Sequence, residues 1–279
     1  MMASRPALQA TFSRTPQYVL TGGLAVLFLF PMVWSAIASV SPQGGTKQVN
    51  GFGLGNYVTL MHYGAGVPTY FFNSLIISLM TVTLTLLVSV IGGYAFARFS
   101  FFGKNVLFLL TLGILMVPYG TLLIPMYVLL NTIGLHDSLI GLSLVLALFQ
   151  LPFAIFMMRI SFESVPRELE ESALVDGAGS LGVLRRIMLP AVLPGLVTVG
   201  LFAFLAAWND FIAPLILING DKNYPLPLAI ATLRQQTSYT IDYGATEAGV
   251  VVMAVPCLLL FILLQRYYVR GFMSGAIKG

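Results

Sequence analysis

Charged residues are scarce in this sequence, and cysteine and histidine are nearly absent. Asp, Glu, Lys and Arg together make up only 9% of the 279 residues, whereas 58% are hydrophobic. So few charges do not describe a soluble surface, and the composition indicates a membrane protein. The single cysteine, Cys257, excludes a disulfide or a thiolate metal cluster within the chain. His62 and His136 lie far apart without a flanking Asp/Glu pair at a metal-ligand spacing, so we predict no metal site.

Motifs for nucleic-acid binding and ATP hydrolysis are also missing. The net charge is +4, but no cluster of five or more basic residues occurs, so we predict no nucleic-acid partner. The phosphate-binding pattern G-x-x-x-x-G-K-[ST] fails at Gly103-Lys104, because Asn105 follows this pair and Arg98 stands where the first glycine should be. The sequence therefore predicts neither an enzyme nor a cofactor bound by this chain.

Six stretches are long and apolar enough to cross a hydrocarbon core of ~30 Å, which takes about 20 helical residues. They lack the alternation of barrel strands, so we expect an all-α membrane protein. Pro118 and Pro125 interrupt the third stretch, which predicts a bent helix or a break at membrane depth. We expect one transmembrane domain over residues 1–279, with helices at about 17–40, 70–97, 105–130, 138–160, 188–217 and 247–268.

The first stretch has an alternative interpretation as a cleaved signal peptide. Arg5 and Arg14 precede it, and "SAIAS" at 35–39 contains an Ala-x-Ala pattern. Its length of about twenty residues exceeds the 7–15 of a signal's apolar region, so we interpret it as a retained helix.

The basic residues set the expected orientation. Eleven of the fourteen Lys and Arg residues fall on one side of this topology, and Lys47, Lys222 and Arg234 fall on the other. Because cytoplasmic loops carry an excess of Lys and Arg, both termini and residues 161–187 are predicted to be cytoplasmic. The gaps at 41–69, 131–137 and 218–246 are then predicted to face outward.

Residues 161–187, which we call the acidic loop, contain "ELEESALVDGAG", with four acidic residues in twelve positions. Val165, Leu169 and Ala173 recur every four residues, so a short helix is predicted, with Pro166 at its first position. Gly177 and Gly179 predict a bend, after which "SLGVLRRIMLP" resumes as a second short helix. An alternative is a helix lying on the bilayer, but four acidic residues beside an anionic leaflet argue against it.

The acidic loop resembles the coupling loop of ABC importer permeases, whose pattern is Glu-Ala-Ala, three residues, Gly, nine residues, Ile-x-Leu-Pro. Every spacing is intact, and one departure is Ser172 in place of an alanine of the pattern. The matching residues are Glu171, Ser172, Ala173, Gly177, Ile187, Leu189 and Pro190. Beyond the loop, "FNSLIIS", "GGYAFARFSFFGK", "AWNDFIAPL" and the terminal "QRYYVRGFMSGAIKG" are similar to the maltose-type carbohydrate permeases, in particular to their second permease subunit.

This resemblance implies a type I ABC importer permease fold in a bacterial or archaeal cytoplasmic membrane. It implies a second, related permease subunit, two ATP-binding subunits that hold ATP and Mg, and an extracytoplasmic solute-binding protein that docks on the outward side, including 218–246. The loop would insert into a cleft on an ATP-binding subunit. The residues that it would use are Glu168, Glu170, Glu171, Ser172, Ala173, Asp176, Gly177, Ile187, Leu189 and Pro190.

Polar residues inside the apolar stretches are candidates for a translocation path. Asn209 and Asp210 lie deep in the fifth stretch, where such groups usually face a cavity or a polar neighbour. Trp208 could stack on a sugar ring, with packing as the alternative. Asn73 and Gln150 are further candidates, and hydrogen bonding between helices is the alternative for them.

Two classes of function follow from these observations. The first is the permease subunit of an ATP-driven importer for a sugar or sugar derivative, with a polyol or a glycerophosphodiester as other solutes. The second is an ion-coupled secondary transporter or a channel. Asp210 is essentially the one ionisable residue within the apolar stretches, whereas an ion-coupled carrier should show several. The importer is therefore the favoured hypothesis.

Overall fold

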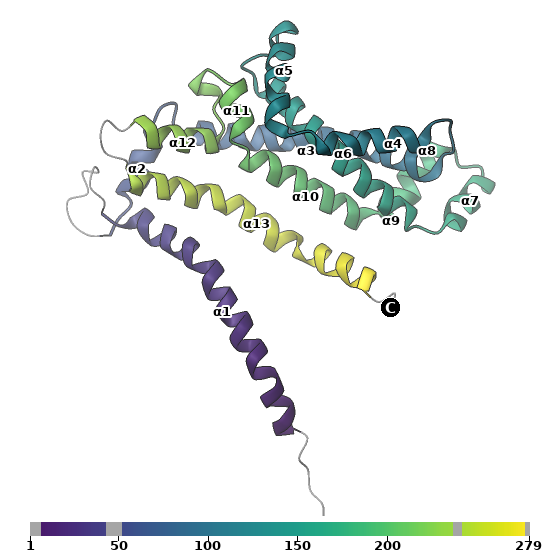
Figure 1. Ribbon diagram of the computed structural model, residues 1–279, viewed down its shortest axis with the longest axis horizontal. Helices are drawn as coiled ribbons and strands as arrows, with labels where there is room; N and C mark the ends of the chain where they lie inside the picture. The colour runs from purple at the N-terminus through teal and green to yellow at the C-terminus, as the bar shows by residue number, and fades with distance from the viewer. Residues whose placement is uncertain (1–6, 43–51, 237–241, 277–279) are drawn as a thin grey trace, which may run out of the picture. The chain divides into compact units, whose positions relative to one another are not determined.

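The computed structural model describes residues 7–42, 52–236 and 242–276 (Figure 1). All regular secondary structure in these ranges is helical, as predicted. The chain forms two compact units, one from residues up to His62 with Leu233–Val252, and the other from Tyr63–Thr232 with the residues from Met253 onward.

The smaller unit contains α1 (Ala7–Val40), α2 (Gly55–Met61) and the start of α13 (Tyr243–Ala276). Asn56 of α2 is buried, and its Nδ2 donates to the carbonyl oxygens of Ser39 at 2.9 Å and Ser41 at 3.0 Å. A Cβ atom on Gly244 would lie 2.5 Å from Asn56 Oδ1, so the glycine permits this close approach. Asn56 thus fixes the two flanking helices of this unit to each other.

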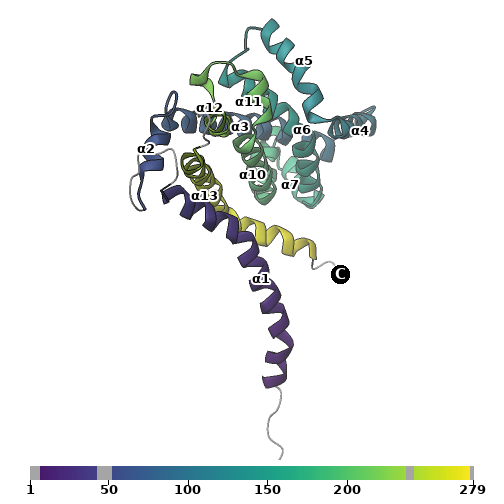
Figure 2. The same ribbon diagram turned by 60° about the vertical axis from the view of Figure 1, so that its left-hand side comes forward.

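The larger unit is built on α3 (Val67–Arg98), which lies beside α6 (Leu139–Glu163) and α10 (Leu193–Asn209) (Figure 1, Figure 2). One face of α3 carries small residues spaced three or four apart, which lets the helices approach closely. These buried residues are Ser74, Ser78, Thr81, Thr85, Ser89 and Gly93. Thr81 Oγ1 lies 3.4 Å from the Ser143 carbonyl oxygen of α6, and Ser143 Oγ lies 3.4 Å from that of Ile77.

The third apolar stretch is broken, which confirms one of the two predicted alternatives. It consists of α4 (Lys104–Gly113), a 3₁₀ turn (Ile114–Met116) and α5 (Tyr119–Thr132), with a bend of 101°. Val117 is extended because the next residue, Pro118, disfavours helical backbone before it.

The fifth apolar stretch corrects the prediction of a helix over 188–217. A bent segment precedes α10 and meets it at an angle of 79°. This segment consists of α8 (Ser180–Val183), a π-helical turn (Leu184–Met188) and α9 (Leu189–Ala191). At the other end α10 stops at Asn209, Asp210 is extended, and α11 (Ile212–Leu217) follows. The Asp210 carboxylate accepts a hydrogen bond from the Ala213 amide at 2.8 Å, which satisfies a backbone donor freed by the break.

The number of candidate membrane spans depends on these bent pairs. Within the described residues, four helices are long and apolar enough to cross a membrane, and six spans result if each bent pair counts as one. The four are Pro16–Val40, Val67–Arg98, Leu139–Glu163 and Tyr243–Gln265. The remaining elements are α7 (Arg167–Val175), a 3₁₀ turn (Asp221–Asn223) and α12 (Leu226–Gln236).

Two adjacent glycines on α3 give a matched test of the packing against α6. A Cβ on Gly93 would lie 2.6 Å from Met158 Cβ and 3.0 Å from the Arg159 backbone nitrogen, whereas one on Gly92 would lie 3.4 Å from Ile155 Cγ1. We expect Gly93→Ala to lower the stability of the protein by about 1–3 kcal/mol through overpacking. Gly92→Ala should leave it unchanged or raise it by up to about 1 kcal/mol, because alanine favours the helix. Melting temperatures of the purified proteins in detergent would compare them, and equal losses for both variants would contradict this packing.

Candidate functional site

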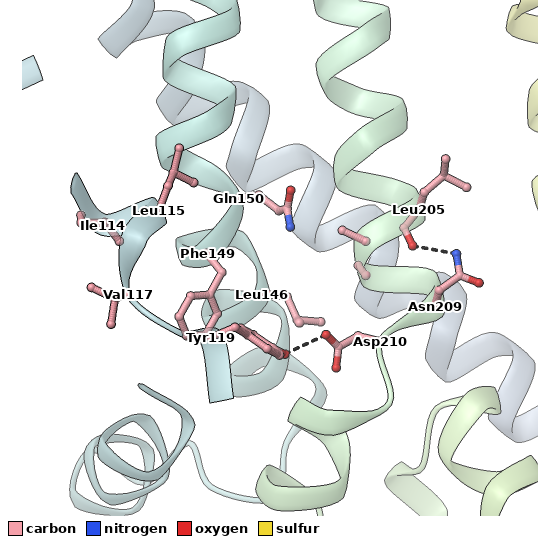
Figure 3. Close-up of a pocket in the computed structure, with 12 residues that line it drawn as sticks. Ile114, Leu115, Val117, Tyr119, Leu146, Phe149, Gln150, Leu205, Asn209 and Asp210 are labelled. Carbon is pink, nitrogen blue, oxygen red and sulfur yellow. Dashed lines mark hydrogen bonds between the residues drawn. The ribbon is translucent and has the colours of Figure 1, made fainter. Parts of the chain in front are cut away.

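A pocket of about 450 Å³ lies where the break between α4 and α5 faces the middle of α6 and the end of α10 (Figure 3). Most of its wall is apolar, and its polar groups come from Tyr119, Gln150, Asn209 and Asp210. The full lining is Ile114, Leu115, Val117, Tyr119, Leu146, Phe149, Gln150, Leu205, Ala206, Ala207, Asn209 and Asp210. The two helix breaks therefore border the cavity and supply three of its four polar groups, and Gln150 of α6 supplies the fourth.

Asp210 and Tyr119 form the polar floor of this pocket. The Tyr119 hydroxyl donates to Asp210 Oδ2 at 2.7 Å, and the ring of Tyr119 packs edge-on against Phe149 with centroids 4.8 Å apart. Asn209 Nδ2 donates to the Leu205 carbonyl at 2.8 Å, and the Gln150 amide points from α6 toward α10 (Figure 3). These groups offer donors, acceptors and aromatic surface to a polyhydroxylated ligand. The lining contains one carboxylate and no Lys or Arg, so it suits an uncharged ligand better than an anion.

Of the five residues predicted to line a translocation path, Gln150, Asn209 and Asp210 lie in the pocket. Trp208 and Asn73 lie elsewhere. Trp208 is fully buried, its Nε1 donates to the Met253 carbonyl at 3.0 Å, and its ring packs on Phe71 and Phe204. Trp208 therefore packs between other side chains, the alternative to stacking on a sugar ring, because its neighbours leave no face of its ring open. Asn73 is also buried away from the pocket.

Asn73 instead joins α3 to the loop before α12. Its Nδ2 donates to the carbonyl oxygens of Lys222 at 2.7 Å and Tyr224 at 3.0 Å. Nearby, Ser74 Oγ accepts a hydrogen bond from the Leu226 amide at 2.8 Å. These bonds follow the structural alternative that the sequence left open for Asn73.

The acidic loop has the predicted form of a short helix, a bend and a second short helix. α7 begins at Arg167, one residue after the predicted Pro166. Gly177 has φ +87°, a region that favours glycine, and the Ala178 amide donates to the Ala173 carbonyl at 3.0 Å, as in a Schellman helix end. Val165 and Ala173 are buried, but Leu169 is 50% exposed, so the predicted apolar stripe is wrong at its middle position.

The coupling candidates of the acidic loop divide into an exposed group and a packed group. Ile187 and Leu189 are half-buried against the same apolar cluster as Ala173 and Met188. The exposed candidates are Glu168, Glu171, Ser172, Asp176, Gly177 and Pro190. Three exposed apolar side chains lie in the same loop and were not predicted as coupling residues: Leu174, Val175 and Leu181.

Glu170 differs from the other acidic candidates because it turns inward. Its side chain is 15% exposed and lies 3.2 Å from the Arg98 guanidinium of α3. In this conformation the Glu170 carboxylate is engaged within the chain, and its predicted contact with a partner stays a prediction. Arg98 and Tyr94, which both contact it, were not recognised from the sequence.

At the far end of α6, Asp137 joins the turn before α6 to the segment after α11. Asp137 Oδ1 accepts hydrogen bonds from the amides of Asn219 at 3.0 Å and Gly220 at 3.1 Å. Burial raises the pKa of Asp137, but these amide bonds, the Asn223 side chain and the nearby His136 outweigh it and lower the pKa below its ordinary value. Asp137 has φ +51°, a conformation that Asp and Asn tolerate.

Within the described residues, no group of three or more His, Cys, Asp or Glu side chains could hold a metal ion.

Comparison with known families and proteins gives consistent relationships. Residues 86–273 match the family described as binding-protein-dependent transport system inner membrane component. The chain is 34% identical to the probable ABC transporter permease protein YurM of Bacillus subtilis (strain 168), over 90% of this chain and 78% of YurM. It is 31% identical to the diacetylchitobiose uptake system permease protein DasC of Streptomyces coelicolor, over 97% and 99% of the two chains. It is 33% identical to the arabinooligosaccharides transport system permease protein AraQ of Bacillus subtilis, over 92% of each.

Among solved structures, a chain of a bacterial ABC transporter involved in the import of alginate has a similar fold. Its TM-score is 0.79 at 21% identity, with 96% of this chain and 100% of that chain covered. The described helices therefore adopt the fold of an ABC importer permease.

The Asp137 hydrogen bonds predict a pH-dependent stability. Because the folded-state pKa lies below the unfolded value of about 3.9, their contribution is present above that value and is lost as pH falls through the folded pKa. We expect the melting temperature of the purified protein to fall more steeply between about pH 5 and pH 3 in the wild type than in Asp137→Asn, whose amide oxygen accepts at every pH. Identical slopes for the two proteins would show that Asp137 does not carry this dependence.

Proposed function

This chain belongs to the family of binding-protein-dependent transport system inner membrane components, and we propose that it imports a sugar or sugar derivative as a permease subunit of an ABC importer. As a member of this family it is a multi-pass protein of the inner membrane and a transport subunit rather than an enzyme. Family membership favours the importer over the ion-coupled carrier that the sequence left as an alternative.

The pocket at the α4–α5 break is the observation that carries the proposal of a sugar. Its Tyr119, Gln150 and Asn209 groups suit hydroxyl ligands, and the neighbouring ring of Phe149 suits the apolar face of a sugar. Two of the similar proteins are named as permeases for diacetylchitobiose and arabinooligosaccharides, which agrees with a carbohydrate. We propose that Gln150, Asn209 and Asp210 line the translocation path in this chain, and that Trp208 and Asn73 support it from outside.

We propose six membrane spans in a single permease domain, counting each bent pair as one span. Both termini and the acidic loop are then cytoplasmic, as the distribution of Lys and Arg suggests. The contacts of α3 support placing the acidic loop and the segment 218–246 on opposite sides of the membrane. Glu170 of the acidic loop pairs with Arg98 at the end of α3, whereas the Leu226 amide donates to Ser74 near the beginning of α3.

We further propose that the exposed side of the acidic loop docks on an ATP-binding subunit. Exposed acidic side chains there surround exposed apolar ones, the composition of a protein-binding surface. This surface comprises Glu168, Glu171, Leu174, Val175, Asp176 and Leu181. The complete importer would contain a second permease subunit, two ATP-binding subunits that hold ATP and Mg, and a solute-binding protein on the outward face.

Docking is tested by two glycines of the loop. An added Cβ meets nothing within 4 Å at either Gly177 or Gly179, but only Gly177 has positive φ. A β-branched residue is strained at positive φ, so Gly177→Val should displace the bend, whereas Gly179→Val is the matched control. When the chain is co-expressed with its partner subunits, we expect Gly177→Val to lower substrate-stimulated ATP hydrolysis by about five- to thirtyfold, since about 1–2 kcal/mol of strain acts on the docking geometry. Equal activity of both variants would contradict docking through this bend.

The pocket is tested by Gln150→Ala in the same assembled complex. The Gln150 side chain faces the pocket, so its removal should weaken binding of a hydroxylated solute by about 1 kcal/mol, or roughly fivefold in uptake at low substrate concentration. Gln265→Ala, at an exposed position of α13, is the control. Uptake of radiolabelled disaccharides into vesicles would measure the effect, and unchanged uptake by Gln150→Ala would remove this residue from the path.

A further inference from the structure

Arg98 ends α3 and is almost completely enclosed, with 5% of its side chain exposed. Its Nη2 donates to the carbonyl oxygen of Phe162, in the last turn of α6, at 2.8 Å, and to that of Val165, just after α6, at 2.6 Å. The last carbonyls of a helix lack partners within the helix and carry partial negative charge, which a guanidinium neutralises. Arg98 therefore fastens the end of α3 to the end of α6.

The same guanidinium also holds α7. Its Nε lies 3.2 Å from Glu170 Oε2, and the Tyr94 hydroxyl, one turn earlier on α3, donates to Glu170 Oε1 at 2.6 Å. Each oxygen of the Glu170 carboxylate is thus engaged by a different side chain of α3. Tyr94 itself is buried, packing edge-on against Phe99 and Phe162. We call these three residues, Tyr94, Arg98 and Glu170, the Arg98 cluster.

α7 itself has few other attachments in the described structure. α7 is nine residues long, and the loop bends at Gly177. Of the α7 residues, Ala173 is the one that is fully buried, and a small apolar contact fixes position without fixing angle. The Tyr94 hydroxyl restricts the direction of the Glu170 carboxylate through its hydrogen bond, and Arg98 Nε, which has no hydrogen-bond partner, adds an ion pair at 3.2 Å.

We propose that the Arg98 cluster sets the angle of α7 against α3 and α6, so that force applied to α7 by an ATP-binding subunit moves these helices as one body. This inference rests on the proposed function, and it adds positioning residues that do not touch the partner. Glu170 would act within the chain, while its neighbour Glu171 remains exposed for docking. Weakening the cluster should then separate ATP hydrolysis from transport while the subunits still assemble.

Glu170→Gln is the main test, because glutamine keeps the shape of the side chain and still accepts from Tyr94, but loses the charge that faces Arg98. Tyr94→Phe removes only one hydroxyl and serves as a milder second variant. Glu163→Gln is the matched control, since it removes a carboxylate from the exposed ion pair with Arg159 (2.7 Å) at the same end of α6. Exposed pairs of this kind contribute little to stability.

Two measurements distinguish this inference from the proposed function. In the full-length chain alone, hydrogen exchange of residues 167–175 should accelerate by about tenfold or more in Glu170→Gln, without a change in α3 or α6. In the reconstituted complex, the ratio of substrate transported to ATP hydrolysed should fall by roughly two- to thirtyfold, the range for residues that carry coupling between sites. Glu163→Gln should match the wild type in both.

A Glu170→Gln protein that transports as much per ATP as the wild type would overturn the inference, whatever its exchange rates. Faster exchange throughout α3 and α6 would also overturn it, because the cluster would then support the fold as a whole. Faster exchange in α7 of the chain alone, together with a wild-type complex that shows no ATP-driven transport, would count against the proposed function and not against the positioning of α7.

Discussion

The requirement that every backbone N–H and C=O inside a membrane find a partner is the constraint on which this structure depends. Unbroken helices meet it within their own backbone, as the interior of α3 does. Where a helix breaks, a side chain or a cavity must replace the missing bonds. At the end of α10 the replacement is Asp210, which accepts from the Ala213 amide and from Tyr119. The pocket lies at this point because a break frees space and brings polar groups at the same time.

The same constraint explains the arrangement at the other end of α6. Arg98 adds a charged donor to the Phe162 carbonyl in the last turn of α6 and to the Val165 carbonyl just beyond that helix. A guanidinium buried for this purpose needs a counter-charge, and Glu170 supplies it from the following helix. The same Arg98 side chain therefore both binds the end of α6 and pairs with the acidic loop, so these two features depend on one buried charge.

The sequence predicted the features that depend on neighbouring residues. The all-helical fold follows from the apolar runs, the break in the third stretch from Pro118, and the bend in the acidic loop from Gly177. Features that depend on residues distant in sequence were not predictable, because nothing local marks them. Glu170 and Glu171 are adjacent and chemically identical, yet one pairs with Arg98 and the other is exposed. Trp208 and Asn209 are also adjacent, and only the packing of Phe71 and Phe204 decides that Trp208 faces away from the pocket.

α3 connects these parts because it bears specific contacts along its whole length. Near its beginning, Asn73 and Ser74 bind backbone groups of the segment that leads into α12. In its middle, Ser and Thr side chains and Gly93 hold it close to α6, leaving little room for the two helices to separate. At its end, the Arg98 cluster holds α7. Bending α3 would break buried hydrogen bonds near its beginning and at its end. Under the coupling proposed above, a displacement of α7 would therefore act on the segment before α12 through α3.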